Sequence, residues 1–107
     1  MNKVIMQGIL AKDNYFKVSE KGNAFLTNSI NIKTEKANDF FNIVAFGKIA
    51  EDIADKFNKG DILNFEGKLK NNSYEKNGEK KYTVQIVIDK VFIGNQSDPV
   101  KDEEFPF

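Results

Sequence analysis

Hydrophobic and polar side chains alternate along most of this chain, which is the pattern of β-strands, because successive strand residues point to opposite faces of a sheet. The segment Asp39–Gly47 differs, since both of its rows are largely apolar or aromatic. One row carries Phe40, Asn42, Val44 and Phe46, and the other carries Phe41, Ile43 and Ala45. A strand packed on both sides explains this pattern, and so does a strand that exposes one row of rings for stacking against a flat ligand.

The remaining strands are predicted on both sides of this aromatic segment. Alternation and turn residues place them at Val4–Leu10, Tyr15–Val18, Ala24–Lys33, Asp61–Asn71 and Lys80–Ile93. Asn28 interrupts the apolar row of its strand, and the pattern gives no reason for it. We expect a loop over residues 72–79, because Asn77-Gly78 is a strong hairpin signal.

One helix is predicted directly after the aromatic segment, where the hydrophobic period changes. Apolar residues recur at the spacing of one helical face, at Ile49, Ala50, Ile53, Ala54 and Phe57. The run Asn58-Lys59-Gly60 then supplies a C-terminal stop, because glycine tolerates the left-handed conformation that often ends a helix.

The long strands therefore give an order of three strands, one short amphipathic helix and two strands joined by a protruding hairpin. Gly8 and Gly67 lie inside strands, where a small barrel must bend. A five-stranded Greek-key β-barrel with its helix between strands 3 and 4 is the OB-fold. We predict this all-β fold, whose members bind oligonucleotides, oligosaccharides or proteins, so the fold alone does not decide the function.

Composition removes most enzymatic mechanisms. The 107 residues include no cysteine and no histidine, which excludes disulfides, the usual zinc sites and Ser-His or Cys-His catalysis. No pair of carboxylates stands out, so we expect a binding protein without cofactors. The N-terminus is too polar for a signal peptide and no apolar run is long enough to span a membrane, which predicts a soluble, cytoplasmic protein.

Charge divides the chain into two parts although the net charge is zero. Residues 1–94 hold 15 lysines against 12 acids, and residues 95–107 hold one lysine against four acids. We expect a folded domain over 1–94 and a flexible acidic tail over 95–107. All basic residues are lysines, so any bound anion meets point charges rather than the bidentate fork of arginine.

Short motifs along nearly the whole chain resemble those of bacterial and phage single-stranded DNA-binding proteins. They are Asn2-Lys3-Val4-Ile5 with Gly8, Leu10 and Lys12-Asp13; Asp39–Lys48 with Ala50-Glu51; Lys59-Gly60-Asp61; Glu66-Gly67-Lys68-Leu69; Ser73-Tyr74-Glu75 with Gly78 and Tyr82-Thr83; and the end Asp102-Glu103-Glu104-Phe105-Pro106-Phe107. Each motif is weak alone, whereas the body pattern together with this terminus is specific.

The resemblance implies which residues contact DNA. Phe40 and Tyr74 occupy positions of base-stacking aromatics, and Phe46 occupies that of a phenylalanine with the same role; such stacking suits a binder that ignores base sequence. Asn42 stands where the family often has a basic residue. The expected backbone contacts, beside Asn42, are Lys3, Lys48, Lys59, Lys70 and Lys81.

Three features depart from the family pattern. The chain has no tryptophan, so stacking falls to smaller rings. The loop Thr34–Asn38 is short and lacks an aromatic residue. The chain that follows the domain, tip included, is only about a dozen residues, which reach at most about 45 Å when extended. The tip itself, Asp102 to Phe107, combines acids with two rings and is expected to bind partner proteins rather than serve as a solubilising end.

The resemblance implies a protein that coats and protects single-stranded DNA during replication, recombination and repair, recruits processing enzymes through its tip, and forms a homotetramer or a homodimer. An OB-fold adaptor that binds proteins, of the primosome type or a phage accessory factor, is the alternative from another class. The third hypothesis is that the protein is an RNA chaperone.

Overall fold

Six strands and one helix form residues 1–92, the part of the chain that the computed structural model describes. In chain order they are β1 (Val4–Leu10), β2 (Tyr15–Val18), β3 (Ala24–Lys33), β4 (Asn38–Phe46), α1 (Gly47–Lys56), β5 (Ile62–Lys76) and β6 (Glu79–Val91). Every predicted strand and the predicted helix are present, and β2 is a short addition to the five long strands. The predicted domain boundary at residue 94 and the predicted tail lie outside the described residues.

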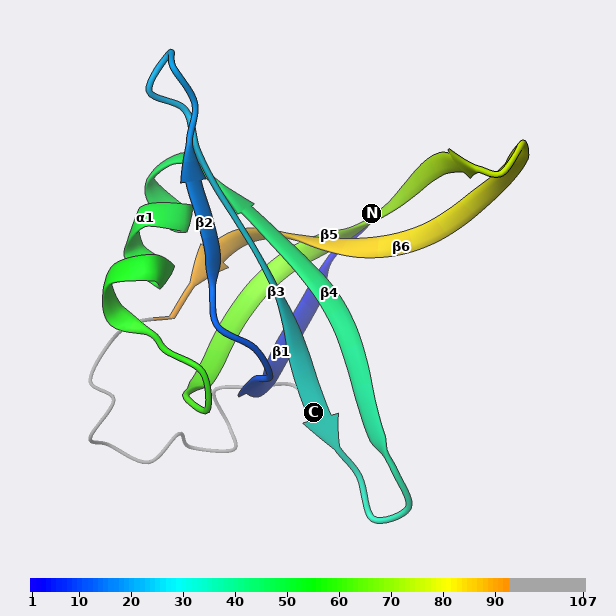
Figure 1. Cartoon of the computed structure of the whole chain (residues 1–107). Helices are drawn as coiled ribbons and strands as arrows, with labels where there is room; N and C mark the ends of the chain where they lie inside the picture. The colour runs from blue at the N-terminus through cyan, green and yellow to red at the C-terminus, as the bar shows by residue number, and fades with distance from the viewer. Residues whose placement is uncertain (93–107) are drawn as a thin grey trace.

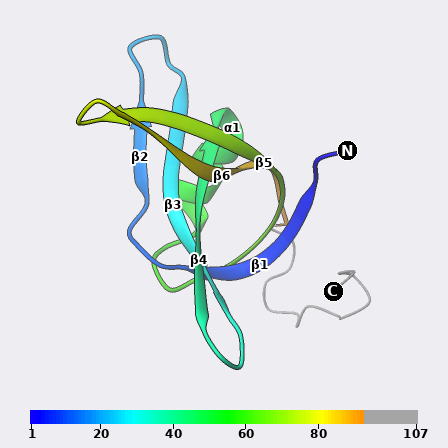
Figure 2. The same ribbon diagram turned by 90° about the vertical axis from the view of Figure 1, so that its right-hand side faces the viewer.

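The strands form one sheet in the order β1-β5-β6-β4-β3-β2, which a further pairing between β1 and β3 closes into a ring. β3 makes this closure because one of its edges serves two partners: Ala24 to Thr27 pair with β2, whereas Ile30 and Asn31 pair with β1. The β4–β6 pairing is parallel and the others are antiparallel. This arrangement agrees with the predicted OB-fold (Figures 1 and 2).

Two interior glycines allow the barrel to close, as the sequence predicted. A methyl group on Gly67 would overlap the carbonyl oxygen of Val87, and this is where the β5–β6 register shifts at a bulge. A methyl group on Gly8 would lie 2.6 Å from a side-chain carbon of Ile30. Both strands therefore approach their neighbours more closely than a residue with a Cβ atom permits.

The hydrophobic core lies inside the ring and beneath α1. Its largest fully buried side chains are Leu10, Leu26, Ile30, Ile43, Ile53, Phe57, Leu63, Phe65 and Ile86. The helix contributes Ala50 and Ile53, the residues that its apolar face predicted, and Phe57 follows at its C-terminal end. Burial of this one face explains why a helix of only ten residues is stable, because isolated helices of this length are marginal in water.

The prediction of a loop over residues 72–79 is wrong. Strand pairing continues to Lys76 and Glu79, and only Asn77-Gly78 form the turn, both with positive φ angles of 54° and 78°. The segment lacks the alternating apolar pattern of a strand because it belongs to a two-stranded ribbon that extends beyond the barrel (Figure 1). Both faces of this ribbon are exposed to solvent, so neither needs an apolar row. We call residues 70–85 the β5–β6 ribbon.

The side chain of Asn2 marks the point where the ribbon leaves the barrel. Its amide nitrogen donates to the carbonyl oxygen of Leu69 at 2.7 Å, and its oxygen accepts from the Leu69 N–H at 3.0 Å. The regular β1–β5 pairing extends only to Val4 and Gly67. Asn2 therefore replaces a strand partner for one more residue of β5.

Candidate nucleic-acid interface

The aromatic row of β4 lies on the outer face of the barrel. Phe40 and Phe46 are 60% and 58% exposed, whereas Ile43 and Ala45 of the alternate row are buried in the core. The structure thus decides between the two explanations that the sequence left open. β4 packs against the core with one row, and the rings at the two ends of its other row are accessible for stacking.

Asn42 connects this row to the β5–β6 ribbon. Parallel pairing aligns Asn42 with Gln85 of β6, and antiparallel pairing aligns Gln85 with Lys70 of β5. Aligned residues share a face of the sheet, and neighbouring strands are about 4.8 Å apart. Lys70 and Asn42 therefore lie on the same face with their backbones about 10 Å apart.

Tyr74 continues the same face along the ribbon. It follows Lys70 by four residues, which keeps it on the same side of a strand, and it lies directly opposite Lys81. The ring is 49% exposed. Tyr82 is 71% exposed but belongs to the opposite face, because it aligns with Ser73. The ribbon thus presents one tyrosine on each side, and only Tyr74 shares a side with Phe40.

The structure brings two of the five predicted lysines onto this face. Lys70 forms no salt bridge with another residue of 1–92. Lys81 lies beside Tyr74 across the ribbon, and its ammonium group is 3.0 Å from the carboxylate of Glu79. This pair is exposed, so the ion pair is weak and both charges remain hydrated.

The other three predicted lysines lie elsewhere. Lys3 precedes β1 and pairs with Glu66 at 3.5 Å, on the side of the barrel that β1 and β5 cover. Lys59 lies in the turn between α1 and β5. Figure 1 shows this turn on the far side of the barrel from the tip of the β5–β6 ribbon. Lys48 lies in the first turn of α1, two residues after Phe46, and so borders the end of the aromatic row.

The ammonium group of Lys48 is engaged by acids of its own helix. Its ammonium group is 3.2 Å from the carboxylate of Asp52 one helical turn later. A hydrogen bond to Asp52 and the charge of that carboxylate raise the pKa of Lys48, with smaller contributions from Glu51 and Asp55. A phosphate at this position would compete with three acids.

Two further lysines on the outer face were not predicted. Lys68 aligns with Val87 of β6, which in turn aligns with Val44 of β4, so it lies in the row next to Lys70 and Asn42. Lys33 of β3 lies opposite Asn38 at the start of β4. Side chains two residues apart on a strand share a face, so Lys70 would have identified Lys68 from the sequence. The position of Lys33 on this face depends on the β3–β4 register, which the sequence does not give.

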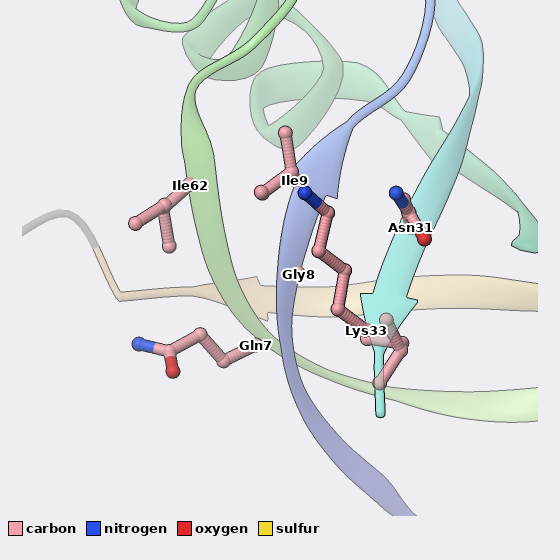
Figure 3. A pocket seen from close by; sticks show the side chains of 7 residues that line it. Gln7, Gly8, Ile9, Asn31, Lys33 and Ile62 are labelled. Carbon is pink, nitrogen blue, oxygen red and sulfur yellow. The ribbon is translucent and has the colours of Figure 1, made fainter. Parts of the chain in front are cut away.

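A pocket of about 200 Å³ is lined by residues of β1, β3 and the start of β5 (Figure 3). Gln7, Asn31, Lys33 and Ile62 contribute to its wall. Asn31 lies directly opposite Phe40, so the pocket borders the aromatic row. The side-chain oxygen of Asn31 is buried and accepts no hydrogen bond from another residue of 1–92.

Within residues 1–92, no group of three or more acidic, histidine or cysteine side chains could hold a metal ion. Over the same residues, no helix is long and apolar enough to cross a membrane. What the described surface offers is an outer face of exposed rings and lysines.

Comparison with known proteins identifies the family. Residues 1–93 match the single-strand binding protein family. The chain belongs to this family. This confirms the resemblance found in the sequence and the predicted OB-fold, and it supports a DNA-binding protein rather than an enzyme.

Relatives within the single-strand binding protein family come from several bacteria. The chain is 35% identical over 103 residues to a single-stranded DNA-binding protein of Fusobacterium nucleatum, and the aligned region covers 88% of this chain and 67% of that protein. It is 33% identical over 93 residues to single-stranded DNA-binding protein 2 of Streptococcus agalactiae, covering 80% and 71%. It is 34% identical over 94 residues to a single-stranded DNA-binding protein of Clostridium perfringens, covering 83% and 63%.

Proposed function

We propose that this protein binds single-stranded DNA without regard to base sequence and coats it during replication, recombination and repair in the bacterial cytoplasm. The observation that carries the proposal is the outer face on which Phe40 and Tyr74 are exposed together with Lys70. Every base has a flat face that stacks on an aromatic ring, so rings bind all sequences, while lysines neutralise phosphates.

In this arrangement Phe40 and Tyr74 hold bases at the two edges of the face. Asn42, Lys70 and Lys81 lie between or beside them and contact the backbone. Phe46 holds a base at the α1 end of β4. Lys3 and Lys59, which the family resemblance also suggested, lie away from this face, and we assign them no contact with a strand bound there.

Titration of a labelled oligothymidine at two salt concentrations tests the proposal. We expect binding whose affinity falls with salt, with a log–log slope of about −0.7 for each neutralised phosphate. The mass of the complex, measured alongside, gives the number of subunits. Absence of binding would favour the OB-fold adaptor that binds proteins, and equal affinity for RNA of the same length would favour the RNA chaperone.

We also propose that the protein forms a homotetramer, or a homodimer, as the family resemblance implied. Among residues 1–92, one edge of β1 has no strand partner over residues 4–8, because β3 pairs only with Ile9 and Leu10. An unpaired edge is a template for pairing with another chain. A monomeric mass at micromolar concentration would overturn this part of the proposal.

The acidic tip, residues 102–107, completes the proposed function as a site for replication and repair proteins. It lies outside the described residues, so the proposal rests on its sequence alone. Removing Phe105 to Phe107 is expected to abolish capture of such partners and to leave DNA affinity intact or raised. A fall in DNA affinity would instead assign the tip to the DNA-binding surface.

A further inference from the structure

A row of three aromatic rings crosses β2, β3 and β4 at the α1 end of the outer face. Phe25 of β3 lies directly opposite Phe46 of β4. The ring of Tyr15 on β2 packs against Phe25, with ring centroids 6.0 Å apart and planes inclined by 57°. Tyr15 and Phe25 were not predicted as site residues, because the pairing of their strands brings them beside Phe46.

The three rings differ in exposure in a way that suits binding. Tyr15 is 55% exposed, nearly the same as Phe46 at its 58%, and Phe25 between them is only partly exposed. Phe25 therefore packs against the ring of Tyr15 and is the cross-strand neighbour of Phe46, while the two outer rings keep more than half of their surface exposed. Rings whose role was to pack against the sheet would have most of their area buried, because exposed aromatic surface is unfavourable in water.

The charge around this row favours a polyanion. Lys17 lies directly opposite Phe25 and is exposed. The residues that share the outer face on β2, β3 and β4 include lysines and no acid: Tyr15, Lys17, Phe25, Thr27, Ser29, Asn31, Lys33, Asn38, Phe40, Asn42, Val44 and Phe46. A strand of phosphates that follows β2, β3 and β4 therefore meets lysines and no carboxylate on these strands, whereas the acids of α1 that surround Lys48 lie past the Phe46 end of the row.

The position of Tyr15 is fixed by the residue before it. The side chain of Asn14 donates to the carbonyl oxygen of Phe57 at 2.9 Å and accepts from the side chain of Asn28 at 2.8 Å. These bonds anchor the start of β2 both to the end of α1 and to β3. A ring held in place before binding loses less conformational freedom when a base stacks on it.

We propose that Tyr15, Phe25 and Phe46, together with Lys17, form a nucleobase-stacking subsite that extends the DNA path from β4 onto β2. The occupant is the same single strand that crosses Phe40, so the inference rests on the proposed function. Tyr15 and Phe46 each stack one base, and Lys17 contacts the phosphate between or beside them. The subsite supplies a stacking contact that the short loop Thr34–Asn38, which lacks an aromatic residue, does not.

Single tryptophan reporters test the subsite, because the natural chain contains no tryptophan. We expect the fluorescence of Y15W and of F40W to fall when oligothymidine of about 30 nucleotides is added, since stacking on a base quenches indole emission. Such a strand exceeds the roughly 4–16 nucleotides that one OB-fold covers. Y82W is the control, because Tyr82 lies on the opposite face of the ribbon.

The outcomes separate the two proposals. Quenching of F40W without quenching of Y15W would overturn the subsite and leave the proposed function in place. Failure of the labelled oligonucleotide to bind any variant or the natural protein would overturn the proposed function. Equal quenching of Y15W and Y82W would show an effect that does not depend on the face, and it would also overturn the subsite.

Affinity measurements provide a second test that does not rely on a reporter. We expect Y15A to weaken binding of the same oligonucleotide by about 5- to 100-fold and Y15F to retain it, because a stacking ring carries the contact. K17Q is expected to reduce the salt slope by about 0.7, the value for one phosphate contact. Unchanged affinity in Y15A, with its fold verified by thermal unfolding, would contradict the inference.

Discussion

The side-chain amide of Asn28 on β3 pairs with the backbone of Lys12 in the turn that follows β1. Its nitrogen donates to the Lys12 carbonyl oxygen at 2.9 Å, and its oxygen accepts from the Lys12 N–H at 3.2 Å. The same oxygen accepts from the N–H of Ser29 at 2.6 Å. Asn28 is buried, so this polar residue in an apolar row holds the turn that precedes Tyr15.

Replacing Asn28 with leucine should therefore destabilise the protein. Leaving part-buried polar groups of Lys12 and Asn14 without partners costs about 1–3 kcal/mol of the free energy of unfolding. For a domain of this size, a thermal midpoint lower by at least about 5 °C should result. Asn31→Leu is the matched control on the same strand, because the side-chain oxygen of Asn31 accepts no hydrogen bond within residues 1–92. An equal fall of the thermal midpoint in both variants would contradict the role of Asn28 in holding the turn at Lys12.

Removing the two predicted stacking rings should weaken DNA binding without unfolding the domain. Phe40→Ala with Tyr74→Ala deletes contacts worth about 1–3 kcal/mol each, so the dissociation constant for oligothymidine should rise at least about 30-fold. Both rings are about half exposed, and the thermal midpoint should change little. Tyr82→Ala, on the other face of the ribbon, should leave affinity unchanged. A large loss of stability in the double variant would assign the rings to the core.

Lysines on and off the outer face should differ in the salt dependence of DNA affinity. Lys70→Gln should reduce the log–log slope by about 0.7, because one phosphate contact is lost. Lys48→Gln should reduce it less, since Asp52 already engages that ammonium group. Lys59→Gln is the control at the far end of the molecule. Titration at four salt concentrations measures the slopes, and a larger effect of Lys59 than of Lys70 would place the DNA elsewhere.

A methyl group at Gly67 should disrupt closure of the barrel. Gly67→Ala forces the new Cβ atom against the Val87 carbonyl oxygen, a backbone atom that cannot rotate away. We expect a loss of about 2 kcal/mol or more in the free energy of unfolding, measured by urea titration, as for other strained close contacts. Asn71→Ala, exposed on the same strand, should be nearly neutral.

Most of the fold followed from hydrophobic periodicity. Alternation located every strand, and the change of period after Gly47 located α1, because burial against one core imposes both patterns. Two features were not readable in this way. The ribbon has no buried face and so no alternating apolar row, and Asn28 is explained only by its partners in a distant turn.

The candidate site was predictable where a motif carried it. Phe40, Phe46 and Tyr74 were predicted from their rows and from the family pattern, and all three are exposed, as stacking on DNA would require; their contact with DNA stays a prediction. Lys3 and Lys59 were assigned to the same surface because spacing along the chain says nothing about where a barrel closes. Tyr15 and Phe25, which we propose as part of a stacking subsite, were not predicted for the same reason: their proximity to Phe46 is created by the pairing of β2 with β3 and β3 with β4.

The β5–β6 ribbon has no layer of structure beneath it, and every residue from 70 to 82 is exposed. Two-stranded hairpins on their own are only marginally stable, so the amide protons near Asn77 should exchange with solvent far faster than those of the barrel. Local opening of the ribbon would break its own hydrogen bonds and leave the buried core intact. A strand of DNA that crosses Tyr74 would slow this exchange, because the bound strand would hold the ribbon in its paired conformation.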